Sequence, residues 1–459
     1  MTASANNPGV VYLEGNPIPI VSLVGPNDTA RTAPSSVNGV TRQQIMLANP
    51  LTNAPLDLST LSLASVQGLI GQRADGATIQ SDGLAYLDGV VNQLSSKLGR
   101  WYRAVAQALD TPVTIDWGGD STTFGYYSDN VTLNPSDTVA DEMSTPGQLR
   151  RLCAQYYGAR AGFIHSGQSA AVASGGNPLV LGFGLGAFGT AYNASGTVTV
   201  TVPACTSITV YCWNDDGSTG GGVVNGSGSF TVNGGSAINT TLIAGTNKYK
   251  AVTTTTGLNA ASTNTIVWTA PSGSYQGFVG ISYDSGKGVN IGRWGRGGNT
   301  LADFMGHGAN LAFNARTLPW LTAGWTMRTP NLVIIQFNIN EAGLPTGTSV
   351  SQQTTDLTNI IAAVRAAGGC VLLIGDNQYS AYATGHQADF EAVMQSLADS
   401  TADVAYIPFA TIIGAYATAF ANGLMGESSN AIHPNRKGYG LLARFLMRLL
   451  ITNPTGPQF

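Results

Sequence analysis

A serine stands where a short strand pattern ends, in the segment VTIDWGGDSTTFG that spans residues 113–125. Its apolar residues occupy positions 113, 115 and 117, the alternation expected of a strand with one buried face. Gly119, Asp120 and Ser121 follow, and a side chain at the end of a strand is held rigidly yet exposed at the edge of a sheet. That position suits a nucleophilic hydroxyl, although the same residue types are also ordinary turn formers.

Histidine is scarce, which narrows the search for a general base. The chain has four histidines, His165, His307, His386 and His433. The last stands in the segment NAIHPNRKGY (430–439), just before a predicted helix. A histidine at a helix entrance can face a cleft, and near neutral pH it can accept and return a proton. The alternative is an ordinary loop histidine.

Two further stretches can supply hydrogen-bond donors to an oxyanion. The glycine-rich segment 295–300 follows a predicted strand and offers backbone N–H groups that no side chain obstructs, with Gly298 among them. The segment 338–341 follows a buried strand, so the amide of Asn340 can lie over the same sheet edge. Such donors contribute about 3–4 kcal/mol each to a transition state. Taken separately, each segment could also be a plain turn.

In this order the four pieces resemble the SGNH (GDSL-type) hydrolase family. The match rests on Gly119-Asp120-Ser121 with Thr123 and Gly125, on Gly298, on Asn340, and on His433 with its trailing Pro-Asn-x-x-Gly-Tyr. It covers about 112–170 and 286–452. The resemblance implies a serine esterase or lipase that works through an acyl-enzyme, with neither metal nor cofactor. Ser121 would be the nucleophile and His433 the base and then the acid, while the Ser121 N–H, the Gly298 N–H and the Asn340 side chain would form the oxyanion hole.

The chain departs from the family pattern in two places. The third motif usually begins with Gly and ends with Asp, where this chain has Asn338 and Glu341. The family also places an Asp three residues before the histidine, and this chain has Asn430. An Asp there orients the imidazole and stabilises its cation, and its replacement by Asn in a serine protease lowers turnover ~10⁴-fold.

Several groups could compensate for the missing Asp. Asn430 could accept a hydrogen bond from the ring N–H through its carbonyl, as in Cys-His-Asn sites, though without a charge. Glu427 or Asp403 could orient His433 instead, and Asp120 is a further auxiliary candidate. A Ser–His dyad is the remaining alternative.

Strands alternate with amphipathic helices on both sides of a central region. Continuous apolar runs predict buried strands, and residues spaced three and four apart predict helices. The predicted strands are 113–117, 289–291, 332–337, 370–374 and 404–409, and the predicted helices are 146–157, about 357–367, about 390–397 and 437–450. This pattern predicts an α/β fold with a doubly wound parallel sheet, flavodoxin-like and three-layered (α/β/α), whose site lies at the carboxyl ends of the strands.

Residues 175–285 lack helical periodicity and hold short alternating runs bounded by Gly, Asn and Ser. They predict an inserted antiparallel β-sandwich, similar to a jelly roll. The insert divides the hydrolase domain into parts 112–174 and 286–459. Tyr211, Trp213 and Trp268 could pack in the core of the sandwich or serve as aromatic platforms for sugars.

Residues 1–80 look like an irregular docking arm, with one helix predicted around 56–70. In the next segment, 81–111, apolar residues at 84, 87, 91, 94, 98, 101 and 105 form a seam with heptad spacing. Such a seam can join helices of three chains into a short stalk, or it can pack against the following domain.

Composition limits the classes of function. Hydrophobic residues make up 43% and charged residues only 10% of the 459 residues, with 58 glycines and a net charge of −4. These values give no basis for binding nucleic acid, and we expect neither a signal peptide nor a membrane-spanning segment. The four scattered cysteines are expected to be reduced and buried.

The layout as a whole is typical of a bacteriophage tail or baseplate component. We therefore expect a homotrimeric virion protein whose arm binds other tail proteins and whose esterase removes acyl groups, O-acetyl groups among them, from host cell-surface glycan or lipid. The alternatives are a receptor-binding tail protein with an idle hydrolase fold, and a secreted acylesterase.

Overall fold

The computed structural model describes residues 94–452 with gaps, and before them the backbone of four short strands. The segments outside the description are 1, 4–10, 13–30, 38–39, 47–93, 95, 134, 136, 166–170, 175–178, 181–189, 194–195, 214–227, 241–248, 271–274, 296, 306, 308–327, 344–348, 378–386, 427–431 and 453–459. For some residues of the described elements only the backbone is given. The chain divides into two units, Met1–Gly89 and Val90–Phe459.

The first unit contains two antiparallel strand pairs within the segment that was predicted to be an irregular arm with one helix. Strand β1 (Thr2–Ala3) pairs with β2 (Val11–Tyr12). Strand β3 (Arg31–Val37) pairs with β4 (Val40–Met46), with Val37 opposite Val40. The two residues between β3 and β4 are Asn38-Gly39, the dipeptide most typical of a tight hairpin, and this signal could have identified the pair. The helix predicted around 56–70 lies outside the described residues.

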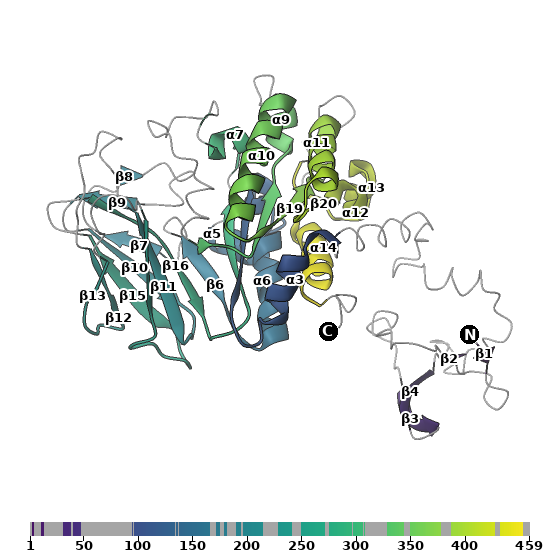
Figure 1. The fold of residues 1–459 in the computed structure, drawn as a ribbon, viewed down its shortest axis with the longest axis horizontal. Helices are drawn as coiled ribbons and strands as arrows, with labels where there is room; N and C mark the ends of the chain where they lie inside the picture. The colour runs from purple at the N-terminus through teal and green to yellow at the C-terminus, as the bar shows by residue number, and fades with distance from the viewer. Residues whose placement is uncertain are drawn as a thin grey trace. The chain divides into compact units, whose positions relative to one another are not determined.

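A parallel sheet forms the centre of the second unit (Figure 1). Its strands, in spatial order, are β17 (Val289–Gly295), β5 (Val113–Gly119), β18 (Leu332–Gln336), β19 (Cys370–Gly375) and β20 (Val404–Pro408). In chain order this is 2-1-3-4-5, the flavodoxin-like arrangement that was predicted. After β5 the chain forms β17 on one side of it, and later forms β18 on the other side. A topological switch point therefore lies at the carboxyl end of β5, where open α/β sheets bind their ligands.

Helices cover both faces of this sheet because its strands are apolar on both sides. One layer contains α7 (Leu301–Phe304), α9 (Ile339–Gly343), α10 (Val350–Ala366) and α11 (Gln387–Ser400). The opposite layer contains α3 (Gly99–Ala106), α5 (Asp137–Met143), α6 (Thr145–Tyr157), α12 (Phe409–Ile413) and α14 (Arg436–Leu446), which continues as a π-helix, η5 (Met447–Ile451). Val333 and Ile335 pack with α10 and α11, while the alternate residues Leu332 and Ile334 are buried toward the other layer.

The described part of the heptad seam is buried inside the chain's own fold. Leu94, Leu98 and Trp101 are fully buried. The indole N–H of Trp101 donates to the carbonyl of Leu450 at 3.0 Å, which fixes α3 against η5. These contacts favour the alternative in which the seam packs on the following domain. Its first residues, at positions 84, 87 and 91, lie outside the described residues.

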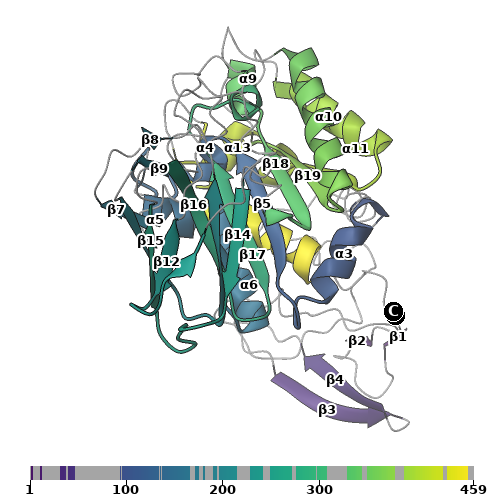
Figure 2. The ribbon, with the colours of Figure 1, turned by 60° about the vertical axis from the view of Figure 1, so that its left-hand side comes forward.

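Two antiparallel sheets pack face to face beside the parallel sheet (Figure 2). One has the order β13 (Ile238–Asn239), β12 (Ser229–Val232), β15 (Asn264–Thr269), β10 (Thr197–Val202), β7 (Ala171–Ser174). The other has the order β14 (Tyr249–Thr254), β11 (Ser207–Trp213), β16 (Tyr275–Asp284), β9 (Thr190–Asn193), β8 (Leu179–Val180), and β6 (Gly162–His165) also pairs with β16. The antiparallel sheets thus begin at Gly162, before the predicted boundary at 175, because β6 bridges the two parts of the unit.

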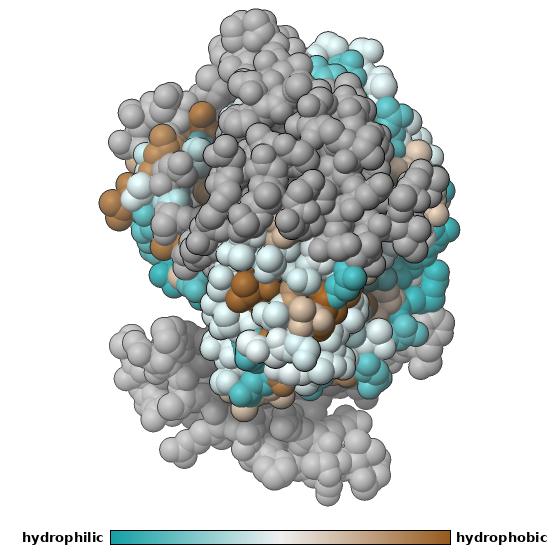
Figure 3. All heavy atoms as spheres, turned by 90° about the vertical axis from the view of Figure 1, so that its left-hand side faces the viewer, coloured by the Kyte–Doolittle hydropathy of each residue, from teal (hydrophilic) through white to brown (hydrophobic). Residues whose placement is uncertain are grey.

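Trp268 packs between the two antiparallel sheets, whereas Tyr211 packs on the other face of its sheet, in the cluster that includes Trp294 of the parallel sheet. Trp268 is fully buried 5.7 Å from the ring of Phe278, and Tyr211 is buried with its hydroxyl 3.1 Å from that of Ser282. Both serve core packing rather than as sugar platforms, while the side chain of Trp213 lies outside the description. All four cysteines are free and buried, as predicted. In Figure 3 the described surface on this side is mostly of intermediate or polar hydropathy. Among the described helices, none is both long and apolar enough to cross a membrane.

Candidate active site

Ser121 is the first residue of a short helix, α4 (Ser121–Phe124), that starts where β5 ends. Asp120 caps this helix, since its side chain accepts a hydrogen bond from the Thr122 N–H at 2.8 Å. Gly119 has no substitute at the junction, because a Cβ there would overlap the side chain of Thr123 and the backbone oxygen of Gln336. The strand can therefore turn into the helix only at a glycine, and Ser121 is held at the switch point of the sheet. The predicted auxiliary residue Asp120 thus acts on the helix start.

The hydroxyl of Ser121 contacts the imidazole of His433. The distance from Ser121 Oγ to His433 Nε2 is 2.8 Å, and both side chains are buried. His433 lies just before α14, and its carbonyl accepts from the Gly426 N–H at 2.9 Å. Asn435 caps α14 through the N–H groups of Lys437 and Gly438. With Nε2 unprotonated, the serine donates to the base that would remove its proton.

The predicted oxyanion donors lie in the segments that follow the two strands flanking β5. Gly298 follows β17 and has φ of +77°, a backbone conformation that L side chains rarely adopt. Asn340 follows β18 and is half-buried, and its Nδ2 donates to the carbonyl of Asn299 at 2.8 Å. An amide nitrogen carries two hydrogens, so the second remains for a substrate oxygen. The bond to Asn299 also ties the two donor segments together at the carboxyl edge of the sheet.

Replacing Asn340 with alanine is expected to lower kcat about 10²-fold and to change KM little. The amide would act on charge that develops only in the transition state, so its loss should appear in kcat. Steady-state kinetics on a chromogenic ester measure both constants. A rise in KM at unchanged kcat would show that Asn340 binds the ground state instead.

Glu341, one of the departures from the family pattern, joins the same two segments. Its Oε1 accepts from the Leu301 N–H at 2.6 Å, at the start of α7. Burial raises the pKa of Glu341 to about 8, although the Leu301 N–H acts in the opposite direction and the carboxyls of Asp376 and Asp303 add to the rise. Glu341 is therefore a buried residue that stabilises the donor loops, and it is protonated over much of the neutral range.

This raised pKa predicts a pH-dependent stability. Because folded Glu341 binds its proton more tightly than the unfolded chain does, its contribution is greatest below about pH 4.5 and declines as pH rises toward about 8. The slope in that window is at most about 1.4 kcal/mol per pH unit. Glu341→Gln should remove this pH-dependent contribution. The free energy of unfolding of the variant, relative to that of the wild type, should therefore increase steadily between pH 5 and pH 8.

Denaturant unfolding at several pH values measures this difference. The exposed Glu142→Gln is the matched control and should leave the pH dependence as it is in the wild type. A difference between Glu341→Gln and wild type that stays constant with pH would contradict the prediction.

The third member of the predicted triad is not placed, because Asn430 and Glu427 lie outside the described residues. Asp403, the other substitute considered, cannot orient His433. It precedes β20 at the amino edge of the sheet, whereas Ser121 lies at the carboxyl edge. Its carboxylate is 3.6 Å from the guanidinium of Arg100 and 3.5 Å from that of Arg365. The prediction failed for Asp403 because adjacency in sequence to a core strand does not say at which edge a residue lies.

Two tyrosines that the sequence analysis passed over flank the imidazole. The ring centroid of Tyr126 lies 5.2 Å from that of His433, and that of Tyr127 lies 6.3 Å away and nearly parallel. Both are half-buried. Tyr127 has φ of +58°, an uncommon conformation for a bulky residue that often marks a functional position. The Tyr-Tyr pair directly after the motif of Ser121 was the signal available in the sequence.

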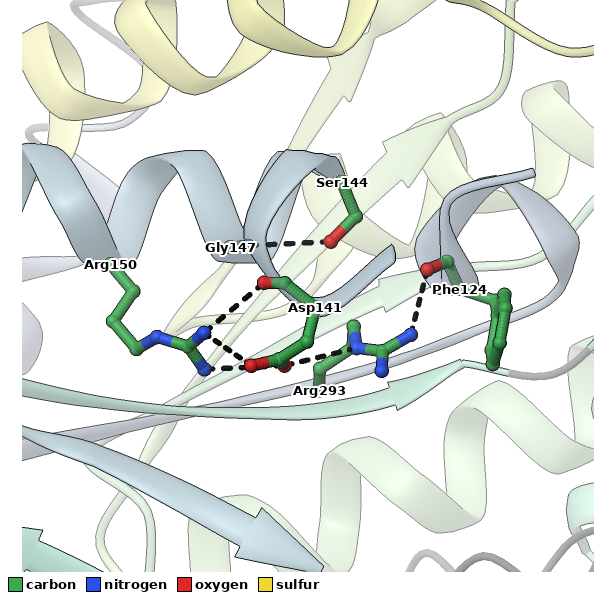
Figure 4. Close-up of polar contacts among 6 residues, drawn as sticks. All are labelled: Phe124, Asp141, Ser144, Gly147, Arg150 and Arg293. Carbon is green, nitrogen blue, oxygen red and sulfur yellow. Dashed lines mark hydrogen bonds and ion pairs between the residues drawn. The ribbon is translucent and has the colours of Figure 1, made fainter. Parts of the chain in front are cut away.

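A buried ion-pair cluster supports the other end of α4 (Figure 4). Arg293 of β17 donates to the carbonyl of Phe124 at 2.7 Å and also lies 3.4 Å from the carboxylate of Asp141. Arg150 of α6 contacts the same carboxylate. Burial would raise the pKa of Asp141, but the two guanidinium groups outweigh it and hold this pKa below its ordinary value. Phe124 ends α4, so the cluster fixes the helix that carries Ser121.

This geometry defines a class of protein, a flavodoxin-like α/β fold with a Ser–His pair at the switch point of its sheet. Residues 263–441 match the GDSL-like Lipase/Acylhydrolase family, a range that includes Gly298, Asn340 and His433. Ser121 lies before that range, and the fold brings it to His433. Comparison with curated proteins found no match.

Solved structures with the same fold include a peptidoglycan O-acetylesterase, which is 15% identical over 78% of this chain and 97% of that chain, with a TM-score of 0.50. A family two carbohydrate esterase from Clostridium thermocellum also matches, with 13% identity over 57% of this chain and 94% of that chain and a TM-score of 0.26. A lipase/acylhydrolase from Enterococcus faecalis matches with 16% identity over 38% of this chain and 81% of that chain and a TM-score of 0.27. Residues 263–441 are thus similar to that family, and the second unit shares its fold with the peptidoglycan O-acetylesterase.

Proposed function

We propose that the protein is a serine esterase that removes acyl groups from a glycan through an acyl-enzyme. The observation that carries this proposal is the 2.8 Å contact between Ser121 Oγ and His433 Nε2 at the switch point of the sheet. An idle hydrolase fold would not need its nucleophile and base aligned within hydrogen-bond distance.

The reaction follows from the placement of these groups. Ser121 Oγ attacks the ester carbonyl carbon while His433 Nε2 takes the hydroxyl proton. The N–H groups of Ser121 and Gly298 and the amide of Asn340 stabilise the oxyanion. The C–O bond to the alcohol then breaks and His433 returns the proton to the leaving oxygen. Water, deprotonated by His433, attacks the acyl-Ser121 ester, and the carboxylic acid leaves as Ser121 is restored.

A glycan is the favoured substrate because of the rings beside the base. Tyr126 and Tyr127 present half-buried aromatic surface next to His433, where the alcohol part of an ester would leave. Aromatic faces can pack against the apolar faces of sugar rings. A peptidoglycan O-acetylesterase has the same fold, so small acyl groups such as acetyl are the first to test.

The proposed setting is a phage tail or baseplate, with the enzyme acting outside the host cell. A chain with only 10% charged residues and 58 glycines has the composition common in extracellular fibres and shells. The separate N-terminal unit, with its own strand pairs, suits attachment to other tail proteins. Secretion of an acylesterase is the other setting compatible with this composition.

The function is tested with the full chain and two kinds of ester. Wild-type protein should hydrolyse p-nitrophenyl acetate and release acetate from O-acetylated peptidoglycan fragments, and Ser121→Ala should do neither. Release of fatty acid from phospholipid vesicles, without release of acetate from the glycan, would identify the substrate as a lipid ester. A folded wild-type protein that cleaves no ester in a broad panel would overturn the proposal.

A further inference from the structure

A buried polar chain runs beneath Ser121 and joins three strand ends. Asp120 directly follows β5, Gln336 ends β18, and Asp376 directly follows β19. All three side chains are buried, with exposed fractions of 3% or less. Asp376 was absent from the predicted site because a lone Asp after an apolar strand is common in sequences. Its position at the carboxyl edge brings it under the nucleophile.

The orientation of Gln336 is fixed by its neighbours. Its Oε1 lies 3.2 Å from the indole nitrogen of Trp117 and 3.3 Å from Thr123 Oγ1. An indole nitrogen can only donate, so that end of the amide must be the oxygen. The Nε2 of Gln336 therefore donates to Asp376 Oδ1, at 2.9 Å.

Thr122 has too few hydrogens for two ionised neighbours. Its Oγ1 lies 2.8 Å from Asp120 Oδ1 and 3.0 Å from Asp376 Oδ1. A hydroxyl donates one hydrogen, and two carboxylates can only accept. If both carboxyls were charged, one of these contacts would be a repulsive pair of buried oxygens. One carboxyl must therefore carry a hydrogen and donate it to Thr122.

The surroundings select Asp120 as the acid. Asp376 receives Gln336, and the backbone N–H groups of Asn338 and Ile339 also favour its charged form. The second oxygen of each carboxyl is buried without a hydrogen-bond partner among the described residues, so the choice rests on the donors. In the described part of the chain, the groups that could donate to Asp120 are the N–H and the hydroxyl of Thr122 alone. The hydrogen bonds then point in one direction. The acid group of Asp120 donates to Thr122 Oγ1, and the Thr122 hydroxyl donates to Asp376 Oδ1. In this arrangement Asp120 Oδ1 still accepts from the Thr122 N–H.

The groups around this buried polar chain disfavour a second negative charge on the pair of Asp120 and Asp376. Burial first, and then the carboxyls of Asp376 and Glu341, raise the pKa of Asp120 well above its ordinary value. Burial also raises the pKa of Asp376. Glu391 of α11 faces Asp376, and burial together with that charge raises the pKa of Glu391 to about 7. The ionisable neighbours that raise the pKa of Asp120 are thus carboxyls, and they favour retention of the shared hydrogen.

We propose that Asp120 and Asp376 share a single proton through the Thr122 hydroxyl. We further propose that this buried polar chain of side chains positions Ser121 for the esterase reaction proposed above. Thr122 is the next residue after Ser121, so the chain fixes the peptide that carries both the nucleophile and one oxyanion N–H. Asp120, Thr122 and Asp376 are positioning residues, since they act through that peptide and not on the substrate.

Infrared difference spectra at pH 7 test the shared proton without any need for activity. Asp120→Asn should remove the carbonyl stretch of a protonated carboxyl group, whereas Asp376→Asn should remove a carboxylate stretch. Loss of a carboxylate stretch in both variants would overturn the proposal, because it would show two ionised groups.

Kinetics test the positioning with two variants of Thr122, one that removes the hydroxyl and one that keeps it. Thr122→Val removes the hydroxyl and should lower kcat about tenfold or more, with KM nearly unchanged, because the chain loses a hydrogen bond to a charged group. Thr122→Ser keeps the hydroxyl and should recover most of kcat. A wild-type kcat in Thr122→Val, or equal losses in both variants, would refute the positioning role. If the wild type hydrolyses no ester, the proposed function fails while the spectra still decide the shared proton.

Discussion

Replacing Ser121 with alanine is expected to lower kcat for ester hydrolysis by roughly 10⁴- to 10⁶-fold, and replacing His433 with alanine by a similar factor. The reason is the 2.8 Å contact between the hydroxyl and Nε2, which makes one catalytic unit of two side chains. Without the serine no acyl-enzyme forms, and without the imidazole the hydroxyl keeps its proton. Initial rates on p-nitrophenyl acetate, measured with a large excess of variant protein, give both factors.

The double variant is the decisive control for this unit. Because either loss alone disables the same step, Ser121→Ala combined with His433→Ala should be no slower than either single variant. The residual rate would come from the oxyanion donors and substrate binding. Losses that multiply would mean that the two residues contribute independently, and the nucleophile would have to be sought elsewhere. Unchanged thermal unfolding of each variant would confirm that the fold is intact.

The sequence allowed the prediction of the central sheet and of the Ser–His contact because both depend on local patterns. Apolar runs such as 332–337 marked strands buried on both faces, and their alternation with helices determined the flavodoxin-like order. In such a sheet the carboxyl ends of neighbouring strands share one edge. Ser121 and His433 were paired through the resemblance of their motifs to the SGNH family, although 312 positions separate them.

Long-range polar contacts could not be predicted in the same way. Nothing near Arg293 in the sequence indicates Asp141 as its partner, since the pair depends on how α5 packs beside β17. The chain through Asp376 depends likewise on the exact ends of three strands. Asp403 shows the opposite error, in which a plausible acid lies at the wrong edge of the sheet. Sequence patterns identify faces of elements, and the partners of buried charges follow only from tertiary packing.

Replacing Arg293 with methionine is expected to cost about 3 kcal/mol of folding free energy, the lower end of the range for breaking a buried ion pair. Arg293 is 2% exposed, and its loss removes one of the two guanidinium groups that contact the half-buried carboxylate of Asp141. The variant also removes the donor to the Phe124 carbonyl and the guanidinium that lies 4.7 Å from the centre of the Phe124 ring. The end of α4 would be released, and kcat should fall beyond what the unfolded fraction explains.

Arg150→Met separates these two effects because the hydrogen bonds of Arg150 drawn in Figure 4 run to Asp141, whereas Arg293 also bonds to Phe124 of α4. Both variants should lose stability in urea unfolding. At a temperature where both remain folded, only Arg293→Met should lose kcat, since only Arg293 fixes the helix that carries Ser121. Equal activity in the two variants would mean that the cluster stabilises the fold alone. Ser121 would then be held in position from its other side, by Asp120 and the residues bonded to it.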